Sequence, residues 1–122
     1  MKTIGLIGGI TWHSTLDYYR LLNEMVNEKL GGVHSAKIIL SSVDFAEIKT
    51  LTLAEDWDAI AELIGKASKE IETAGAGCLV ICANTMHNIA HKVKEMVSIP
   101  IIHIADAAGT AIQEKSKKKV RK

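Results

Sequence analysis

An uninterrupted apolar run, Cys78 to Cys82, limits most strongly what this chain can fold into. Its residues do not alternate with polar ones, which is typical of a strand covered on both faces, as in the middle of a parallel sheet. The run then breaks abruptly into Asn84 and Thr85. Because parallel sheets bind ligands beyond the carboxyl ends of their strands, this break predicts where a functional site lies.

A helix is expected directly after the break. Apolar residues recur there at helical spacing, namely Met86, Ile89, Ala90, Val93 and Met96. Asn84 and Thr85 would therefore open this helix, and capping its first turn is the simplest role for them. The alternative is that the free N–H groups of the first turn attract a carboxylate or a phosphate. The residues alone leave both interpretations open.

The remaining segments alternate between strand and helix patterns. Strands are expected at 2–7, 36–43, 78–82 and 99–104, and helices at 14–30, 56–74, 86–96 and 107–114. Ser14 and Asp17 have the form of a capping box, and Asp106 can cap the last helix. A loop that contains Thr52, and that could include a short helix, is expected after Asp44. This order predicts an α/β fold, a flavodoxin-like four-stranded parallel sheet with right-handed crossovers.

Length and composition allow one domain. The chain has 122 residues, of which 48% are hydrophobic and 24% charged. No signal peptide or membrane-spanning segment is recognisable, so we expect a cytoplasmic protein that does not bind membranes. The net charge is +1, but six of the 15 basic residues lie in a tail at 115–122, which leaves the body acidic and argues against nucleic-acid binding.

The two cysteines cannot form a disulfide with each other. Cys78 and Cys82 lie four positions apart in one expected strand, which separates their Cα atoms by about 13 Å. Unpaired thiols fit a reducing compartment. Cys82 stands at the carboxyl end of the strand, where helix N–H groups could lower its pKa and make it reactive. It could equally be a buried, inert thiol.

Other candidate motifs carry weaker signals. Gly8 and Gly9 follow the first strand without the lysine of a phosphate-binding P-loop, so they indicate a tight turn that lets backbone N–H groups approach an anion. His87 and His91 share a helix face, but the further ligands of a zinc site are missing, and we expect no metal. Trp12 is either the wall of a pocket or a core residue, and His103 is expected to be packed.

Several segments of the chain form a recognisable set. They are residues 1–15, Tyr18-Tyr19, Val43-Asp44-Phe45, residues 82–87, which contain a fairly specific Asn-Thr-x-His motif, and residues 101–106. Together these segments resemble the aspartate/glutamate racemase family, and the resemblance is collinear from residue 1 to about residue 114.

The resemblance implies a cofactor-independent amino-acid racemase acting on aspartate or glutamate. Members of the family have two similar α/β domains with the active site between them, and each domain supplies one residue for proton transfer at the α-carbon. This chain resembles only the N-terminal domain, residues 1–114, followed by the basic tail 115–122. The substrate-binding positions that the resemblance implies are Ile10, Thr11, Thr52, Ala83, Asn84 and Thr85.

The position of the family's catalytic cysteine is occupied by Ala83, and Cys82 stands one residue earlier. A step of one residue along a strand reverses the direction of the side chain, so Cys82 is a catalytic candidate with an unfavourable orientation. We therefore expect a racemase unit that is incomplete in this chain and that forms a homo-oligomer. The alternatives are a non-catalytic carboxylate-binding remnant or interaction domain, and a small phosphate- or nucleotide-binding protein that uses Gly8 and Gly9.

Overall fold

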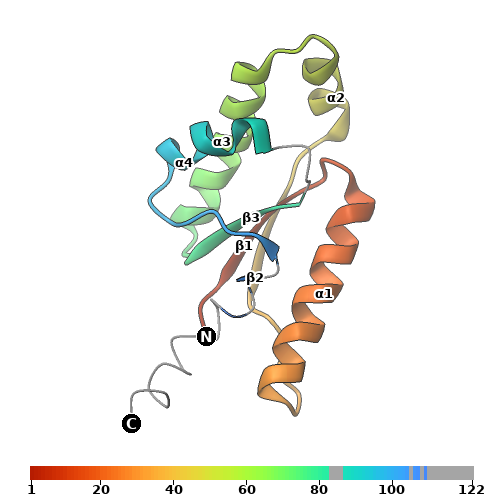
Figure 1. The fold of residues 1–122 in the computed structure, drawn as a ribbon, viewed down its shortest axis with the longest axis vertical. Helices are drawn as coiled ribbons and strands as arrows, with labels where there is room; N and C mark the ends of the chain where they lie inside the picture. The colour runs from red at the N-terminus through yellow and green to blue at the C-terminus, as the bar shows by residue number, and fades with distance from the viewer. Residues whose placement is uncertain (83–86, 105, 108, 110–122) are drawn as a thin grey trace.

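The fold is seen in a computed structural model, which describes residues 1–82, 87–104, 106, 107 and 109. Three parallel strands form a sheet between layers of helices (Figure 1). In chain order the elements are β1 (Ile4–Gly8), α1 (Trp12–Leu30), β2 (Ile38–Ser42), α2 (Phe45–Leu53), α3 (Trp57–Thr73), β3 (Cys78–Ile81) and α4 (His87–Met96).

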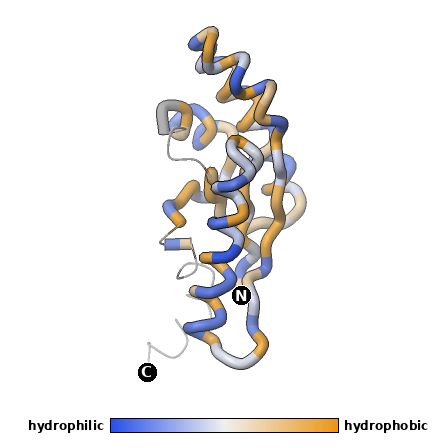
Figure 2. The backbone as a smooth tube through the Cα atoms, turned by 90° about the vertical axis from the view of Figure 1, so that its right-hand side faces the viewer, coloured by the Kyte–Doolittle hydropathy of each residue, from blue (hydrophilic) through white to orange (hydrophobic). Residues whose placement is uncertain are grey.

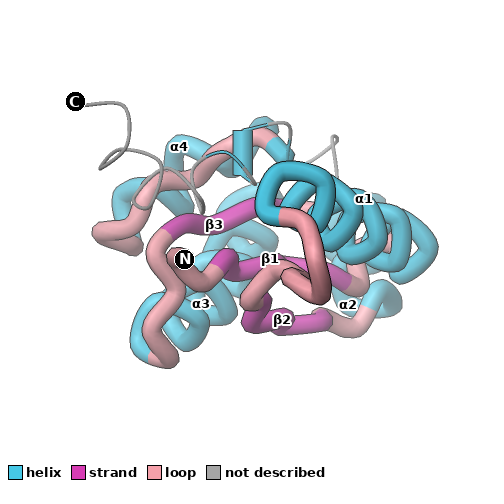
Figure 3. Tube along the Cα trace, turned by 90° about the horizontal axis from the view of Figure 1, so that it is seen from below, coloured by secondary structure: helices cyan, strands magenta, loops and turns pink. Residues whose placement is uncertain are grey.

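The sheet has the order β2-β1-β3, with β1 in the middle. In its register Ile4 lies opposite Ile38 on one side and opposite Cys78 on the other, so the three carboxyl ends lie at one edge. α1 covers one face of the sheet, while α3 and α4 cover the opposite face (Figure 3). The predicted α/β fold with a parallel sheet flanked by helices is confirmed.

The prediction of a fourth strand at 99–104 is wrong for the described residues. This segment reaches the sheet at a single bridge, where Leu79 N–H donates to Pro100 O and Ile102 N–H donates to Leu79 O, both at 2.8 Å. The chain is already helical at Ile104, and Asp106 N–H donates to His103 O at 2.9 Å. Because the backbone turns into this helical conformation, the ladder cannot continue, and Asp106 lies within the turn rather than capping it.

Two apolar cores lie on either side of the sheet, as the unbroken run in β3 predicts. Leu79 packs with the residues of α3 and α4, whereas Val80 packs with Leu22 and Val26 of α1. Both β3 side chains are at most 1% exposed. Since successive side chains of a strand point to opposite faces, a strand between two helical layers must be apolar at every position.

Two local expectations about helix starts differ from the structure. α1 begins at Trp12, with Thr11 as N-cap, so the capping box at Ser14 is wrong; Ser14 N–H and Thr15 N–H already donate to Thr11 O. The segment containing Thr52 is helical, because the Asp44 carboxylate accepts from Ala46 N–H at 3.1 Å and starts α2.

No helix among the described residues is long and apolar enough to cross a membrane.

Candidate functional site at the carboxyl edge of the sheet

The strand order changes direction at β1, so the carboxyl end of β1 is the switch point of the sheet. β2 lies on one side of β1 and β3 on the other, and the chain leaves the strands at the same edge. Cys82 N–H donates to Ile7 O at 2.9 Å, which sets the end of β3 beside the loop that follows β1. In open α/β sheets such a switch point is the usual ligand position. Ala83, Asn84 and Thr85, which follow Cys82, lie outside the described residues.

The glycine turn after β1 is held mainly by the protein itself. Gly9 has φ +82°, and its N–H donates to the buried Thr15 Oγ1 at 2.9 Å. A Cβ atom at Gly9 would collide with Val43 O and would lie 2.6 Å from Ser42 Oγ. The glycine is thus required by its backbone conformation and by the close approach of the chain after β2, and its N–H is already used.

The predicted site residues on the described part of the chain have different environments. Ile10 is 3% exposed and packs in the same core as Ile48 of α2. Thr11 is exposed, and its hydroxyl donates to Ser14 Oγ at 2.9 Å. Thr52 is half-buried, and its hydroxyl donates to Ile48 O at 2.7 Å. Of these three side chains, Thr11 is the one that faces solvent beside the turn after β1.

Cys82 lies in the core beneath α1. It is fully buried, and it packs in one cluster with Leu22 and Val26. Burial raises its pKa to about 12, so at neutral pH only on the order of one thiol in 10⁵ is ionised. A protonated thiol without access to solvent is a poor general base in this conformation. The catalytic role of Cys82 stays a prediction, with this burial against it.

The start of α1 is the part of the carboxyl edge that can attract an anion. Its first turn contains no acidic residue, and the Thr11 side chain makes no capping hydrogen bond. Ser14 N–H donates to Thr11 O, whereas the N–H groups of Trp12 and His13 come too early to have an acceptor within the helix, and such groups favour an anion. Trp12 is 58% exposed and stacks on His13 at a ring distance of 3.8 Å, so Trp12 is not a core residue.

Sequence reasoning missed Thr15, the residue that fixes the Gly9 turn. It is 6% exposed, although it is polar, and it occupies the sheet-facing side of α1, with Tyr18 about one turn and Leu22 about two turns further along that side. A small polar residue within an otherwise apolar helix face was the available signal. His103, which was expected to be packed, is exposed.

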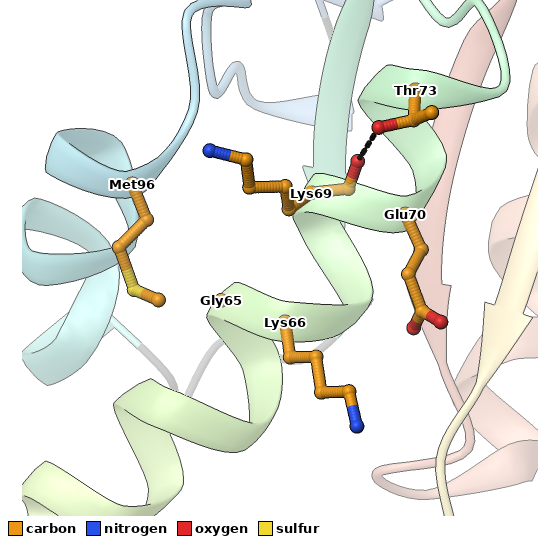
Figure 4. Close-up of a pocket in the computed structure, with 6 residues that line it drawn as sticks. All are labelled: Gly65, Lys66, Lys69, Glu70, Thr73 and Met96. Atoms are coloured by element: carbon orange, nitrogen blue, oxygen red, sulfur yellow. Dashed lines mark hydrogen bonds between the residues drawn. The ribbon is translucent and has the colours of Figure 1, made fainter.

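A concave region lies away from the carboxyl edge, in a groove between α3 and α4 with a volume of about 480 Å³ (Figure 4). The Met96 thioether lies against Gly65 there, and Lys66 and Lys69 flank the opening. Within the described ranges no three His, Cys, Asp or Glu side chains are grouped to hold a metal ion. The absence of a metal site stays a prediction.

The strand order, with helices on both faces of the sheet, defines the class of the protein as a doubly wound α/β domain whose switch point lies beyond the carboxyl end of β1. A family model described as Asp/Glu/Hydantoin racemase matches residues 7–121, and the chain belongs to this family. The predicted relationship to the aspartate/glutamate racemases is confirmed.

Two solved structures are similar to this chain. One is a candidate Asp/Glu racemase from Yersinia pestis, with 46% identity, a TM-score of 0.83 and 95% of this chain covered. The other is an aspartate racemase homologue from Pyrococcus horikoshii OT3, with 34% identity, a TM-score of 0.77 and 94% covered. This chain spans 50% of each of those proteins.

Proposed function

We propose that the chain acts as the N-terminal half of a cofactor-independent amino-acid racemase for aspartate or glutamate, and that its carboxyl edge binds a substrate carboxylate. The observation that carries the proposal is the start of α1, which lies at the switch point with an exposed Thr11 and without an acidic residue in its first turn. Membership of the racemase family supports the proposed substrate class.

The proposed roles divide between hydrogen bonding and shape. Asn84 and Thr85 would donate hydrogen bonds to the carboxylates of the substrate, and Thr11 would do so by turning its single O–H away from Ser14 Oγ. Ile10 and Ala83 would form the apolar floor of the site, and Thr52 would border it from α2. Thr11 is the N-cap of α1, and Asn84 and Thr85 stand in the sequence between β3 and α4; the free N–H groups of a helix start would add to the binding of an anion.

Racemisation requires proton transfer on two sides of the α-carbon, and the described half offers no competent pair. Inversion needs a base on one face of a planar intermediate and an acid on the other. Cys82 is buried with a pKa of about 12, and Ala83 has no ionisable group. We infer that this chain alone binds substrate without turning it over, and that a second α/β unit completes the site in the full enzyme.

The burial of Cys82 also supports a second candidate function, a carboxylate-binding domain without catalytic activity. Both candidate functions include binding of a carboxylate by this chain. They differ in whether a second α/β unit adds the groups for proton transfer. The nucleotide-binding alternative is less well supported, because the Gly9 N–H that would meet a phosphate donates to Thr15. The buried, unpaired thiols Cys78 and Cys82 are compatible with the predicted cytoplasmic location.

Calorimetric titration with L-aspartate tests the proposed site. Thr11→Ala and Asn84→Ala each remove one hydrogen bond to a charged group, so each is expected to weaken binding about tenfold. Thr73→Ala, an exposed threonine of α3, is the matched control and should bind like the parent protein. Unchanged affinity in both site variants, or tighter binding of ATP than of aspartate, would contradict the assignment.

A further inference from the structure

β2 ends in two adjacent serines at the carboxyl edge of the sheet. The strand changes from the apolar residues Ile38–Leu40 to Ser41 and Ser42, so it becomes polar where it reaches this edge (Figure 2). Ser42 lies opposite Gly8, the last residue of β1. Because ligands of open α/β sheets bind beyond the carboxyl ends of the strands, these serines stand where a ligand is expected. Both lie outside the predicted set of substrate-binding positions.

The two serines point to opposite faces of the sheet. A Cβ atom at Gly8 would meet Thr15 of α1 at 2.6 Å, so Gly8 faces α1, and its partner Ser42 faces the same way. Ile39 packs in the core beneath α3, and Ser41, two residues further on, shares that face. Ser42 is exposed, whereas Ser41 is half-buried. The hydroxyl of Ser42 is therefore the one that reaches solvent on the α1 side of the edge.

The Ser42 hydroxyl lies directly beside the turn after β1. A Cβ atom at Gly9 would come within 2.6 Å of Ser42 Oγ. No hydrogen bond joins this hydroxyl to another of the described residues. By contrast, the Thr11 hydroxyl already donates to Ser14 Oγ. The Gly9 N–H likewise donates to Thr15 Oγ1. Ser42 thus offers a donor that can bind a ligand without giving up a hydrogen bond to the described part of the chain.

The start of α1 is close enough to contact the same ligand. Two peptide units separate Gly9 from Thr11, the N-cap of α1, so Ser42 Oγ and the Thr11 Cα atom are at most about 12 Å apart. Two hydrogen bonds of about 3 Å cover half of that span, and a dicarboxylic amino acid can cover the rest. One bound aspartate can therefore reach both β2 and α1.

We propose that Ser42 is a further substrate-binding residue, whose hydroxyl donates a hydrogen bond to a carboxylate of the amino acid bound at the switch point. This inference rests on the proposed function and adds to it a donor from β2. A serine hydroxyl has one O–H to donate and carries no charge, so its contribution is to orient the carboxylate. Ser41, on the opposite face, has no such role.

Calorimetric titration with L-aspartate tests the assignment in three variants. Ser42→Ala removes a hydrogen bond to a charged group, so the dissociation constant should rise about tenfold. Ser42→Thr keeps the hydroxyl and should bind within about threefold of the parent protein. Ser41→Ala is the matched control, because it makes the same chemical change on the other face of the strand, and it should bind like the parent protein.

Ser42→Cys gives a readout that a purely structural role of Ser42 would not change. Cys78 and Cys82 are both buried, so the introduced thiol should be the one that reacts readily with iodoacetamide. L-Aspartate at ten times the dissociation constant of this variant should slow the reaction about tenfold, because the bound ligand covers the thiol. Thr73→Cys, at an exposed position of α3, should react equally fast with and without aspartate.

The outcomes separate this assignment from the proposed function. If the parent protein binds aspartate, the assignment of Ser42 is overturned by unchanged binding in Ser42→Ala, by an equal loss in Ser41→Ala or by failure of Ser42→Thr to bind. Absence of protection in Ser42→Cys overturns it as well. A parent protein that does not bind aspartate overturns the proposed function, and the assignment with it.

Discussion

Replacing Gly9 by alanine tests how the turn after β1 is held. Gly9 has φ +82°, and an alanine in the left-handed region costs about 1–2 kcal/mol. The added Cβ atom would also meet the backbone of Val43, with its N atom at 2.8 Å and its O atom closer. Overpacking against atoms that cannot rotate away costs a further 1–3 kcal/mol or so. The variant is therefore expected to lose about 2–5 kcal/mol of unfolding free energy.

Gly32→Ala is the matched control for this experiment. Gly32 has φ +58°, and a Cβ atom there would meet no heavy atom within 4 Å, so this variant carries the cost of a positive φ without the collision. Both substitutions restrict the unfolded chain equally, and that effect cancels in the comparison. The difference between them isolates the contact with Val43.

Urea unfolding and calorimetry measure the two variants. For a chain of this length, 1 kcal/mol corresponds to about 4 °C in Tm, so Gly9→Ala should melt about 4–12 °C below Gly32→Ala. The two variants would melt within about 2 °C of each other if the loop after β2 could move aside. That result would refute the close packing of the turn.

Two further predictions concern Cys82 and the connection to residues 98–102. Burial raises the pKa of Cys82 from 9.0 to about 12. The protonated thiol therefore stabilises the folded state below about pH 9, and this stabilisation is lost as the pH rises from 9 to 12. For the same reason, alkylation of Cys82 with iodoacetamide should be slow at pH 8 in the folded protein and fast in urea. Equal rates would show that the thiol is accessible. The Glu72 carboxylate accepts from Ser98 N–H at 2.7 Å and from Ile99 N–H at 3.1 Å. Glu72→Ala should therefore lower the free energy of unfolding by about 1–2 kcal/mol and speed amide hydrogen exchange at Ile102. Glu62→Ala, at an exposed position, is the control and should change neither quantity.

The sequence allowed the layers of this fold to be predicted because burial leaves a readable pattern. The run from Cys78 to Cys82 indicates a strand covered on both faces, and in the structure Leu79 and Val80 do lie in different cores. The ends of the helices expected at 14–30 and 56–74 were predictable as well, because a glycine, Gly31 or Gly75, follows each of them, and in the structure both glycines have positive φ. These features depend on local chemistry alone.

The fourth strand could not be judged from local chemistry. Ile101, Ile102 and Ile104 have the composition of a strand, but pairing also requires the backbone to stay extended beside Leu79. The turn closed by the hydrogen bond from Asp106 N–H to His103 O ends the extended conformation, and no pattern in the sequence predicts this turn.

The position of the candidate site was predictable, whereas its internal contacts were not. A break from apolar to polar residues at a strand end predicts the edge where ligands bind. That Thr15 would take the N–H of Gly9, and that Cys82 would lie under α1, depends on how α1 sits on the sheet. A sequence pattern gives the period of a helix but not its final position against its neighbours.

Amide chemical shifts during titration with L-aspartate test the central claim most directly, namely that the carboxyl edge at β1 and β3 binds a substrate carboxylate. The account predicts shifts at Thr11, Trp12, Asn84 and Thr85, with none at Gly65 and Lys69 in the groove between α3 and α4. Proton spectra of the same sample in deuterated water should show the α-hydrogen of aspartate retained. Shifts confined to Gly65 and Lys69, or no shifts at all, would contradict the account.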